Sequence, residues 1–317
     1  MKHTASTMND TEEGAALTAI GFLGFGEVAA HFAAALRDAG AEVLAFDVLL
    51  DRPGGQEKLA ARARGAPPRF APLPEMLARA DVVLSTVTTD VALQAARSCV
   101  PHLRSGQLYV DLNATSPAMK REIATVVDNT GADFVEGAIL SAVGVAGAKA
   151  KVLVCGARAA EAAKRLSALG LDVHDYGPEI GKASSFKMLR SVFSKGIEAL
   201  LVEALLAARR AGVGEALWRE IVATLDAASF EDVGGNWIRT HGSAHERRWH
   251  EMVDVRAMLA DLGLDAPMTE ATVAIFERST RVRLRDAFPS PASSTSAVID
   301  ALDARIRSSP NDKKAQE

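Results

Sequence analysis

The sequence predicts a doubly wound α/β domain followed by an all-α domain. Two observations lead to this fold class. Up to about residue 180, short apolar runs suited to buried strands alternate with helical patterns. From Gly181 onward the strand patterns stop, and helical periodicity continues to Ile306. A chain of 317 residues is long enough to build two separate cores.

We therefore expect an α/β domain at 18–180 and a helical domain at 181–306. Residues 1–17 and 307–317 are polar or charged, and we expect them to be a disordered arm and tail. The arm has no basic start followed by an apolar run, so an ordinary secretion signal is not expected.

Composition narrows the class of protein further. A net charge of −4 gives no basic field that would attract nucleic acid. Charged residues interrupt every apolar run well before it could span a membrane. Cys99 and Cys155 lie in apolar surroundings and suit a reducing cytoplasm. We expect a soluble, cytoplasmic protein that does not act on membranes or nucleic acid.

The first 30 residues of the α/β domain carry its most informative pattern. An apolar run ending at Leu23 leads into a glycine turn, Gly24–Ala29, and then into a helical pattern closed by Gly40. A second apolar run, Ala41–Phe46, ends at Asp47. Strand, glycine turn, helix, strand and acid are the order of a Rossmann-type dinucleotide-binding unit.

The same pattern predicts how the cofactor is held. The glycines allow a tight turn and a close approach of the backbone to a pyrophosphate at the helix N-terminus. Asp47 would accept hydrogen bonds from ribose hydroxyls and repel a 2′-phosphate, so NAD(H) is favoured. Arg52 and Arg62 keep NADP(H) possible, because arginine is the usual partner of that phosphate. The expected cofactor contacts are Gly24, Phe25, Gly26, Glu27, Val28, Asp47, Thr88 and Asn113.

The later strands end in polar or small residues. Residues 51–74 are rich in Pro, Gly and Arg and predict an irregular connection with one short helix. Thr88 follows the strand pattern at 81–87, and Asn113 follows the one at 107–112, where ligands bind in open α/β sheets. The loop at 141–147 consists of small residues, which fits either a ligand-approach loop or an ordinary hairpin.

Gly181–Gly212 predicts one long helix that is apolar on most sides. A narrow polar line containing Lys187 and Ser191 runs along one face. Lys187 either extends to water from the first turn or serves a function in a partly buried place. Because a small helical domain cannot cover so much apolar surface, we expect a homodimer.

Polar and aromatic residues gather at His241–His250. His241 and His245 have the spacing of two metal ligands but no third ligand follows, so no metal site is expected. His245 and Arg248 are candidates for binding an anionic group of a substrate, although a solvated helix face fits the same pattern. We expect Gly242 and Ser243 to break the helix between the two histidines.

The whole order resembles the β-hydroxyacid dehydrogenase superfamily, which includes 3-hydroxyisobutyrate dehydrogenase and 6-phosphogluconate dehydrogenase. Residues 20–29 (IGFLGFGEVA) resemble its cofactor motif, residues 111–117 (DLNATSP) its substrate segment, and residues 181–191 (GKASSFKMLRS) its catalytic segment. The last match implies that Lys187 is the catalytic lysine. The long helix and residues 245–252 (HERRWHEM) look closest to a phosphogluconate-dehydrogenase-like branch whose C-terminal helical domain has no assigned function.

Several positions depart from the family pattern. Asn113 and Ala114 stand where the family has adjacent Ser and Thr, and Ser191 stands where it has Asn. Ala142 and Val143 lie near the place of a glycine pair. The expected substrate contacts are Asn113, Ala114, Val143, Ser191, His245 and Arg248.

The resemblance implies reversible hydride transfer between a nicotinamide and a β-hydroxy acid or similar polar alcohol, with Lys187 as general acid and base. Imine reduction on the same scaffold is an alternative, and relatives that carry it out generally lack the lysine. A non-catalytic dinucleotide-binding module is a further alternative.

Overall fold

The computed structural model describes residues 18–309, so the predicted arm and most of the predicted tail lie outside the described residues. Contacts divide the chain into two compact units. The first unit ends at Ser191 and the second begins at Val192, so the division falls within one long helix.

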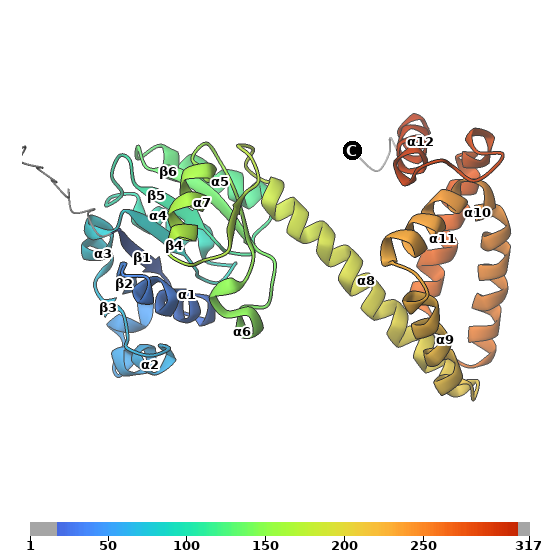
Figure 1. The fold of residues 1–317 in the computed structure, drawn as a ribbon, viewed down its shortest axis with the longest axis horizontal. Helices are drawn as coiled ribbons and strands as arrows, with labels where there is room; N and C mark the ends of the chain where they lie inside the picture. The colour runs from blue at the N-terminus through green and yellow to red at the C-terminus, as the bar shows by residue number, and fades with distance from the viewer. Residues whose placement is uncertain (1–17, 310–317) are drawn as a thin grey trace, which may run out of the picture. The chain divides into compact units, whose positions relative to one another are not determined.

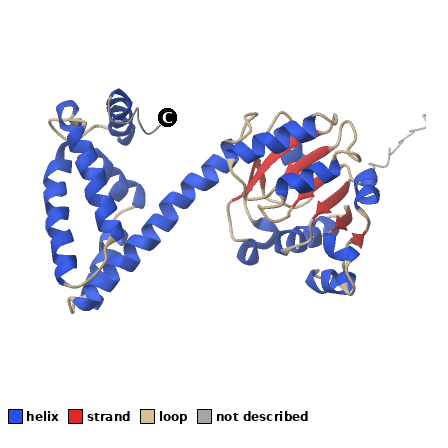
Figure 2. Cartoon of the chain, turned by 180° about the vertical axis from the view of Figure 1, so that it is seen from behind, coloured by secondary structure: helices blue, strands red, loops and turns tan. Residues whose placement is uncertain are grey.

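The first unit is built on one eight-stranded sheet with helices on both faces (Figure 2). The spatial order is β3-β2-β1-β4-β5-β6-β7-β8. Neighbouring strands are parallel, except that β6 and β7 are antiparallel. The strands are β1 Ala19–Leu23, β2 Glu42–Phe46, β3 Arg69–Phe70, β4 Val82–Ser85, β5 Leu108–Asp111, β6 Asp133–Ile139, β7 Val152–Cys155 and β8 Val173–Asp175.

This order confirms the predicted doubly wound fold. The chain builds β2 and β3 on one side of β1, then crosses to build β4 to β6 on the other (Figure 1). Strand order therefore reverses between β1 and β4, and ligands of such sheets bind outside the carboxyl ends of the strands at that point.

The helices of the first unit follow the strands in alternation (Figure 1). They are α1 Glu27–Asp38, α2 Gly55–Arg62, α3 Leu73–Arg79, α4 Ala92–Cys99, α5 Pro117–Asp128, α6 Val143–Ala146 and α7 Ala159–Ala168, with 3₁₀ turns at Val48–Asp51 and Gly147–Lys149. The irregular connection predicted at 51–74 is wrong in part. It holds α2, β3 and the start of α3, because Leu59 and the first residues of α3 pack into the core despite the polar composition around them.

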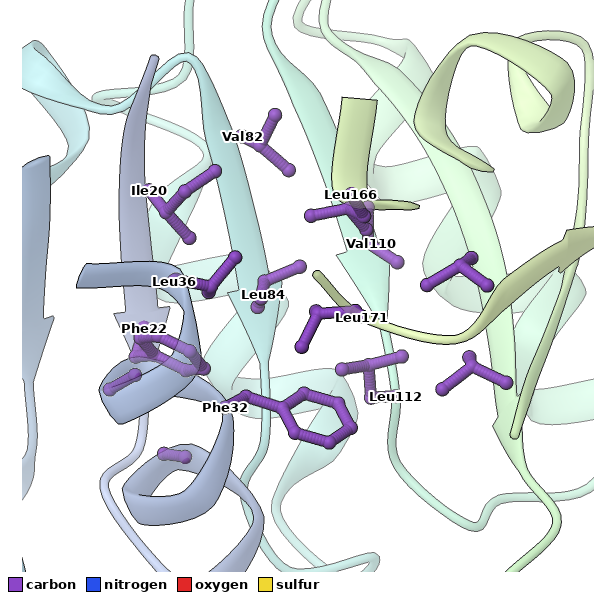
Figure 3. Packing of buried hydrophobic residues seen from close by; sticks show 14 of the residues in the cluster. Ile20, Phe22, Phe32, Leu36, Val82, Leu84, Val110, Leu112, Leu166 and Leu171 are labelled. Atoms are coloured by element: carbon purple, nitrogen blue, oxygen red, sulfur yellow. The ribbon is translucent and has the colours of Figure 1, made fainter. Parts of the chain in front are cut away.

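Two apolar clusters cover the two faces of the sheet. Figure 3 shows one of them, in which Ile20 and Phe22 of β1 meet Leu84 of β4 and Phe32 of α1. Alternate residues point to opposite faces of a strand, so Leu23 belongs to the second cluster, with Tyr109 of β5. Strands buried on both faces explain the nearly continuous apolar runs of the sequence.

The second unit is helical (Figure 1). Its elements are the later part of α8 (Lys182–Arg210), α9 Gly214–Asp226, α10 Phe230–Asp261, α11 Pro267–Arg281 and α12 Thr295–Ser308, with a 3₁₀ turn at Leu284–Ala287. The buried carboxylate of Glu203 accepts hydrogen bonds from the backbone N–H of Met268 and Thr269, both at 2.8 Å, and so caps α11. None of the helices described between residues 18 and 309 is long and apolar enough to cross a membrane.

The helix break predicted at Gly242 and Ser243 is wrong, because α10 runs through both residues. A Cβ atom at Gly242 would lie only 2.9 Å from the ring of Phe288. The glycine therefore serves close packing of the 3₁₀ segment against α10, and it does not end the helix.

Candidate active site

A cavity of about 570 Å³ lies at the carboxyl ends of β1, β2 and β4, and we call it the glycine-turn cavity. Its lining includes every residue of the predicted glycine motif from Gly24 to Val28, together with Asp47 and Thr88. This is the place where strand order reverses. The structure thus brings together seven of the residues predicted to contact a cofactor.

The backbone at the glycine turn leaves room for a charged group. Gly24 has φ +85°, and a Cβ there would lie 2.8 Å from Val87, so only glycine fits without strain. A Cβ on Gly26 would have no atom within 4 Å, which leaves open space beside the start of α1. No side chain caps this helix N-terminus. Its backbone N–H groups can therefore bind an anion such as a pyrophosphate.

The carboxylate of Asp47, at the end of β2, stabilises the glycine turn at the end of β1. One carboxylate oxygen accepts from the backbone N–H of Phe25 at 2.9 Å and the other accepts from that of Leu49 at 2.9 Å. Arg62 reaches the same cavity, where its Nη1 donates to the carbonyl of Phe25 at 3.3 Å. An acid and an arginine therefore both lie where the ribose of a dinucleotide would bind.

Two further cavities continue the first. The strand-end cavity, about 500 Å³, shares Glu27, Val28 and Thr88 with the glycine-turn cavity. The lysine cavity, about 210 Å³, shares Asn113, Ala114 and Lys187 with the strand-end cavity. The shared linings join the three cavities into one groove, which runs from Asp47 to Lys187 within the first unit.

Lys187 lies at one end of this groove, in the second turn of α8, and is half-buried. Burial lowers the pKa of its ammonium group from the usual 10.5, and the positive charge of Lys120 lowers it further. An amine with a lowered pKa can accept and return a proton near neutral pH more readily than an ordinary lysine. Ser191, one turn further on, lines the same lysine cavity and donates to the carbonyl of Lys187 at 3.1 Å.

Asn113 lies just after β5, is buried, and lines the lysine cavity together with Lys187. Its amide nitrogen donates to the Ser85 hydroxyl at 2.9 Å and to the carboxylate of Asp111. Its amide oxygen is buried without a hydrogen-bond partner. A buried acceptor of this kind is available to a hydroxyl or amide donor of a ligand.

The loop at 141–147 connects the antiparallel strands β6 and β7, and it contains the short helix α6, followed by a 3₁₀ turn. Val143 lines the strand-end cavity. A Cβ at Gly144 would lie 2.7 Å from the carboxylate of Glu27, so the loop packs directly on the start of α1.

Three buried charged residues near the groove were not predicted as site residues: Asp111, Lys120 and Glu136. Glu136 accepts from the backbone N–H groups of Gly181 and Ser184, the latter at 2.6 Å, and so caps the helix that carries Lys187. A glutamate inside an otherwise apolar strand was the available signal, because a buried carboxylate needs partners. Lys120 has no such signal, since its position on an amphipathic helix suggests exposure.

His245 and Arg248 belong to α10 of the second unit. His245 is fully buried, and its Nδ1 donates to the carbonyl of His241 at 2.9 Å. Arg248 lines a separate cavity of about 460 Å³ with Trp237, Ile238, His241 and Phe276. Burial, followed by the charges of His245 and Arg248, lowers the pKa of His241 to about 4.

The comparisons with known proteins agree with this geometry. Residues 19–172 match the family model described as the NAD binding domain of 6-phosphogluconate dehydrogenase. Residues 208–279 match a domain of unknown function, DUF1932. The two matches correspond to the sheet-containing unit and to most of the helical unit.

Solved structures and a characterised relative extend the likeness over most of the chain. A conserved hypothetical protein from Sinorhizobium meliloti 1021 is 34% identical, with 91% of this chain and 97% of that chain covered and a TM-score of 0.60. Conserved protein MTH1747, whose structure is reported as similar to 3-hydroxyacid dehydrogenases, is 33% identical, with 84% and 98% covered and a TM-score of 0.58.

2-(Hydroxymethyl)glutarate dehydrogenase of Eubacterium barkeri is 23% identical over 220 residues, with 67% of this chain and 70% of the relative covered. An imine reductase from Aspergillus terreus shares the fold, with a TM-score of 0.70 at 16% identity and coverage of 90% and 99%.

Three observations agree on the family of this chain. The glycine turn can accept a pyrophosphate, a groove leads from it to a half-buried lysine, and two relatives are more than 30% identical over most of the chain. The chain belongs to the β-hydroxyacid dehydrogenase superfamily of NAD(P)-dependent oxidoreductases, in a branch whose C-terminal helical domain has no assigned function.

Proposed function

We propose that the protein is a dehydrogenase or reductase acting on a β-hydroxy acid or a similarly polar alcohol and its carbonyl product. The observation that supports it most is the position of Lys187 at the end of a groove that begins at the dinucleotide-binding turn. A bound nicotinamide dinucleotide accepts or supplies the hydride. The residues of this chain bind the cofactor and substrate and move the proton.

In this proposal Lys187 is the catalytic acid and base. During alcohol oxidation its uncharged amine takes the hydroxyl proton, and during reduction its ammonium returns a proton to the carbonyl oxygen. The free amide oxygen of Asn113 accepts a hydrogen bond from the substrate, and Ser191 holds the substrate oxygen. Ala114 and Val143 line the groove with apolar side chains, which offer water no hydrogen-bond partner.

The substrate class is supported by chemistry and by likeness. The cavity wall combines a cation, an amide and hydroxyl groups, which suits a small polar substrate better than an apolar one. The relative from Eubacterium barkeri acts on a hydroxymethyl-substituted dicarboxylic acid, as its name states. Arg248 remains a proposed contact for an anionic substrate group, supported by its guanidinium in the cavity of the helical unit. His245 has no such support, because it is fully buried and does not line that cavity.

NAD(H) is the proposed cofactor. Asp47 has its carboxylate at the ribose end of the groove, where a negative charge disfavours a 2′-phosphate. Replacing Asp47 with Asn keeps one oxygen for bracing the turn and removes the charge. We expect this variant to shift the ratio of the two dissociation constants toward NADP(H) by about tenfold or more. An unchanged ratio in fluorescence titrations would contradict the role of Asp47.

A substrate panel with a lysine variant tests the proposed activity. The panel contains hydroxy acids, their aldehydes or ketones, and cyclic imines, each with NAD(H) and NADP(H). Lys187→Met should lower turnover about 10²–10⁴-fold while the cofactor dissociation constant changes less than about twofold. Lys195→Met, on the exposed part of the same helix, is the matched control. Turnover of imines alone, or turnover that survives Lys187→Met, would overturn the proposal.

We also propose that the protein is a homodimer joined through its helical unit. α9 has no buried residue, although Trp218, Val222 and Leu225 lie along it. A second copy of this chain fits such a surface, because its net charge of −4 opposes self-association only weakly. A reducing cytoplasm is the proposed compartment, since Cys99 and Cys155 are buried as free thiols.

A further inference from the structure

Lys120 is a lysine with no exposed surface, directly behind the candidate active site. Its Nζ donates to the backbone carbonyl of Asp111 at 2.7 Å and to that of Gly137 at 3.2 Å. The carboxylate of Asp111 lies 3.2 Å from the same nitrogen. The two carbonyls accept hydrogen bonds from the ammonium group, and the carboxylate forms an ion pair with it. Three oxygens from two strands thus hold the buried charge in one place.

One of the residues that Lys120 contacts lines the lysine cavity, and the other holds a residue that lines it. Gly137 lines that cavity together with Lys187. A Cβ at Gly137 would lie 2.5 Å from the side chain of Leu112, so the absence of a side chain lets β6 pack closely against the end of β5. Asp111 accepts from the backbone N–H of Asn113 at 3.1 Å and from its side-chain amide. Lys120 is therefore linked to the lysine cavity through two neighbouring strands, β5 at Asp111 and β6 at Gly137.

Glu136 extends the arrangement to α8. It precedes Gly137 in β6, and its carboxylate caps the first turn of α8 by accepting from backbone N–H groups six and three residues before Lys187. Asp111 and Glu136 both attract the ammonium of Lys120. One buried group of charges thus connects the substrate side of the site, at Asn113, with the helix that carries the proposed acid and base.

We propose that Lys120 is a positioning residue, a fixed positive charge that holds the wall of the lysine cavity and acts electrostatically on Lys187. This role rests on the proposed function of Lys187 as acid and base. An uncharged amine is needed before Lys187 can take a proton from an alcohol. The fixed positive charge of Lys120 favours the uncharged amine of Lys187 without contacting the substrate.

The charges around Lys187 are consistent with this role. Those from the surrounding elements are Glu27 of α1, Asp111 of β5, Lys120 of α5 and Glu136 of β6. Three of them are negative and would favour a protonated lysine. Lys120 supplies the opposing charge, and it is the charge that lowers the pKa of Lys187 after burial itself. The pKa of Lys120 is also lowered, because burial outweighs the attraction of Asp111 and Glu136.

Competitive labelling of amines tests the proposal without any substrate. Trace acetic anhydride labels uncharged amines, and mass spectrometry measures labelling of Lys187 as a function of pH. Exposed Lys182, which pairs with Glu179 at 2.8 Å, is the internal control. The variants are Lys120→Met, Lys120→Arg, and the double variant Asp111→Asn with Lys120→Met. The double variant avoids leaving a charged carboxylate buried without its partner, so it remains testable if the single variant does not fold.

In Lys120→Met we expect the midpoint of Lys187 labelling to move up by about 0.5–1 pH unit, while that of Lys182 stays in place. The double variant also loses the negative charge of Asp111, so its midpoint should rise by less. Lys120→Arg keeps the charge and should keep the wild-type midpoint. The pH profile of alcohol oxidation should move by the same amount. A midpoint that rises in neither Lys120→Met nor the double variant, or an equal shift in Lys120→Arg, would overturn the proposal. If no substrate is turned over, the proposed function fails and the labelling result still decides the role of Lys120.

Discussion

The two units bury their apolar side chains to different extents. β1 and β4 of the first unit are buried along their whole length, and helices cover both faces of the sheet. In the helical unit, α9 has no buried residue, and Trp218 and Leu225 are 47% and 39% exposed. The first unit completes its own core, whereas the helical unit presents apolar surface of the kind that marks an interaction site.

In the proposed function the first unit carries the reaction and the helical unit carries the assembly of the dimer. The groove from Asp47 to Lys187 is built entirely from the unit with the complete core. A closed, well-packed core holds reacting groups in a fixed geometry. The helical unit, with its exposed apolar faces, is suited to assembly. We expect substitutions in the two units to differ accordingly.

The largest expected difference is in the response to removing a leucine side chain. Leu84→Ala, in β4, should lower the free energy of unfolding by about 2–5 kcal/mol, because it leaves a cavity in a closed core. Leu225→Ala, in α9, should cost less than about 1 kcal/mol in dilute solution, where the proposed dimer is dissociated. Denaturant titrations at low protein concentration measure both values. Similar losses would show that the two units are packed alike.

A charge on the exposed apolar face should affect assembly rather than folding. Trp218→Glu should weaken the proposed dimer by about 2 kcal/mol or more, since large aromatic residues contribute most to interfaces. Sedimentation equilibrium measures the change in dissociation constant, with Glu220→Gln on the same helix as the control. A Trp218→Glu protein that dimerises like the wild type would place the interface elsewhere.

Two buried glutamates permit a matched comparison between the units. Glu136 caps α8 in the first unit, and Glu203 caps α11 in the second. Replacing either with Gln should lower the free energy of unfolding by about 1–3 kcal/mol, because one good acceptor is lost. Glu136→Gln should also lower turnover by about tenfold or more through displacement of Lys187, whereas Glu203→Gln should keep it. Equal turnover in the two variants would argue that the start of α8 does not position the lysine.

The smallest expected effect is a displacement of the pH profile. Burial and Lys120 lower the pKa of Lys187 below 10.5. Alcohol oxidation needs the uncharged amine, so its rate should rise with pH and level off at a pH below that of an ordinary lysine. Carbonyl reduction needs the ammonium, so its rate should fall over the same range. Steady-state rates in both directions locate the midpoint, and a midpoint at 10.5 or above would exclude a proton-transfer role for a perturbed Lys187.

The residue pattern alone was sufficient to predict the doubly wound fold and the glycine turn. Both depend on local features. Apolar strands alternate with helices along the chain, and position 24 requires glycine because its φ is positive. The composition of residues 51–74 predicted the elements there poorly, because burial of a few side chains such as Leu59 outweighed local preference. α10 continues through Gly242, which packs against Phe288, a residue 46 positions further along the chain that local sequence could not indicate.

The surroundings of Lys187 could be decided only by the tertiary structure. Its position in a helix follows from periodicity, but its half-buried state depends on β5, β6 and α5 meeting behind it. Lys120, Asp111 and Glu136 are separated by up to 25 positions in sequence, and only the parallel pairing of β5 with β6 brings them together. The electrostatic potential at an amine depends on distances to other charges, and those distances exist only once the sheet has formed.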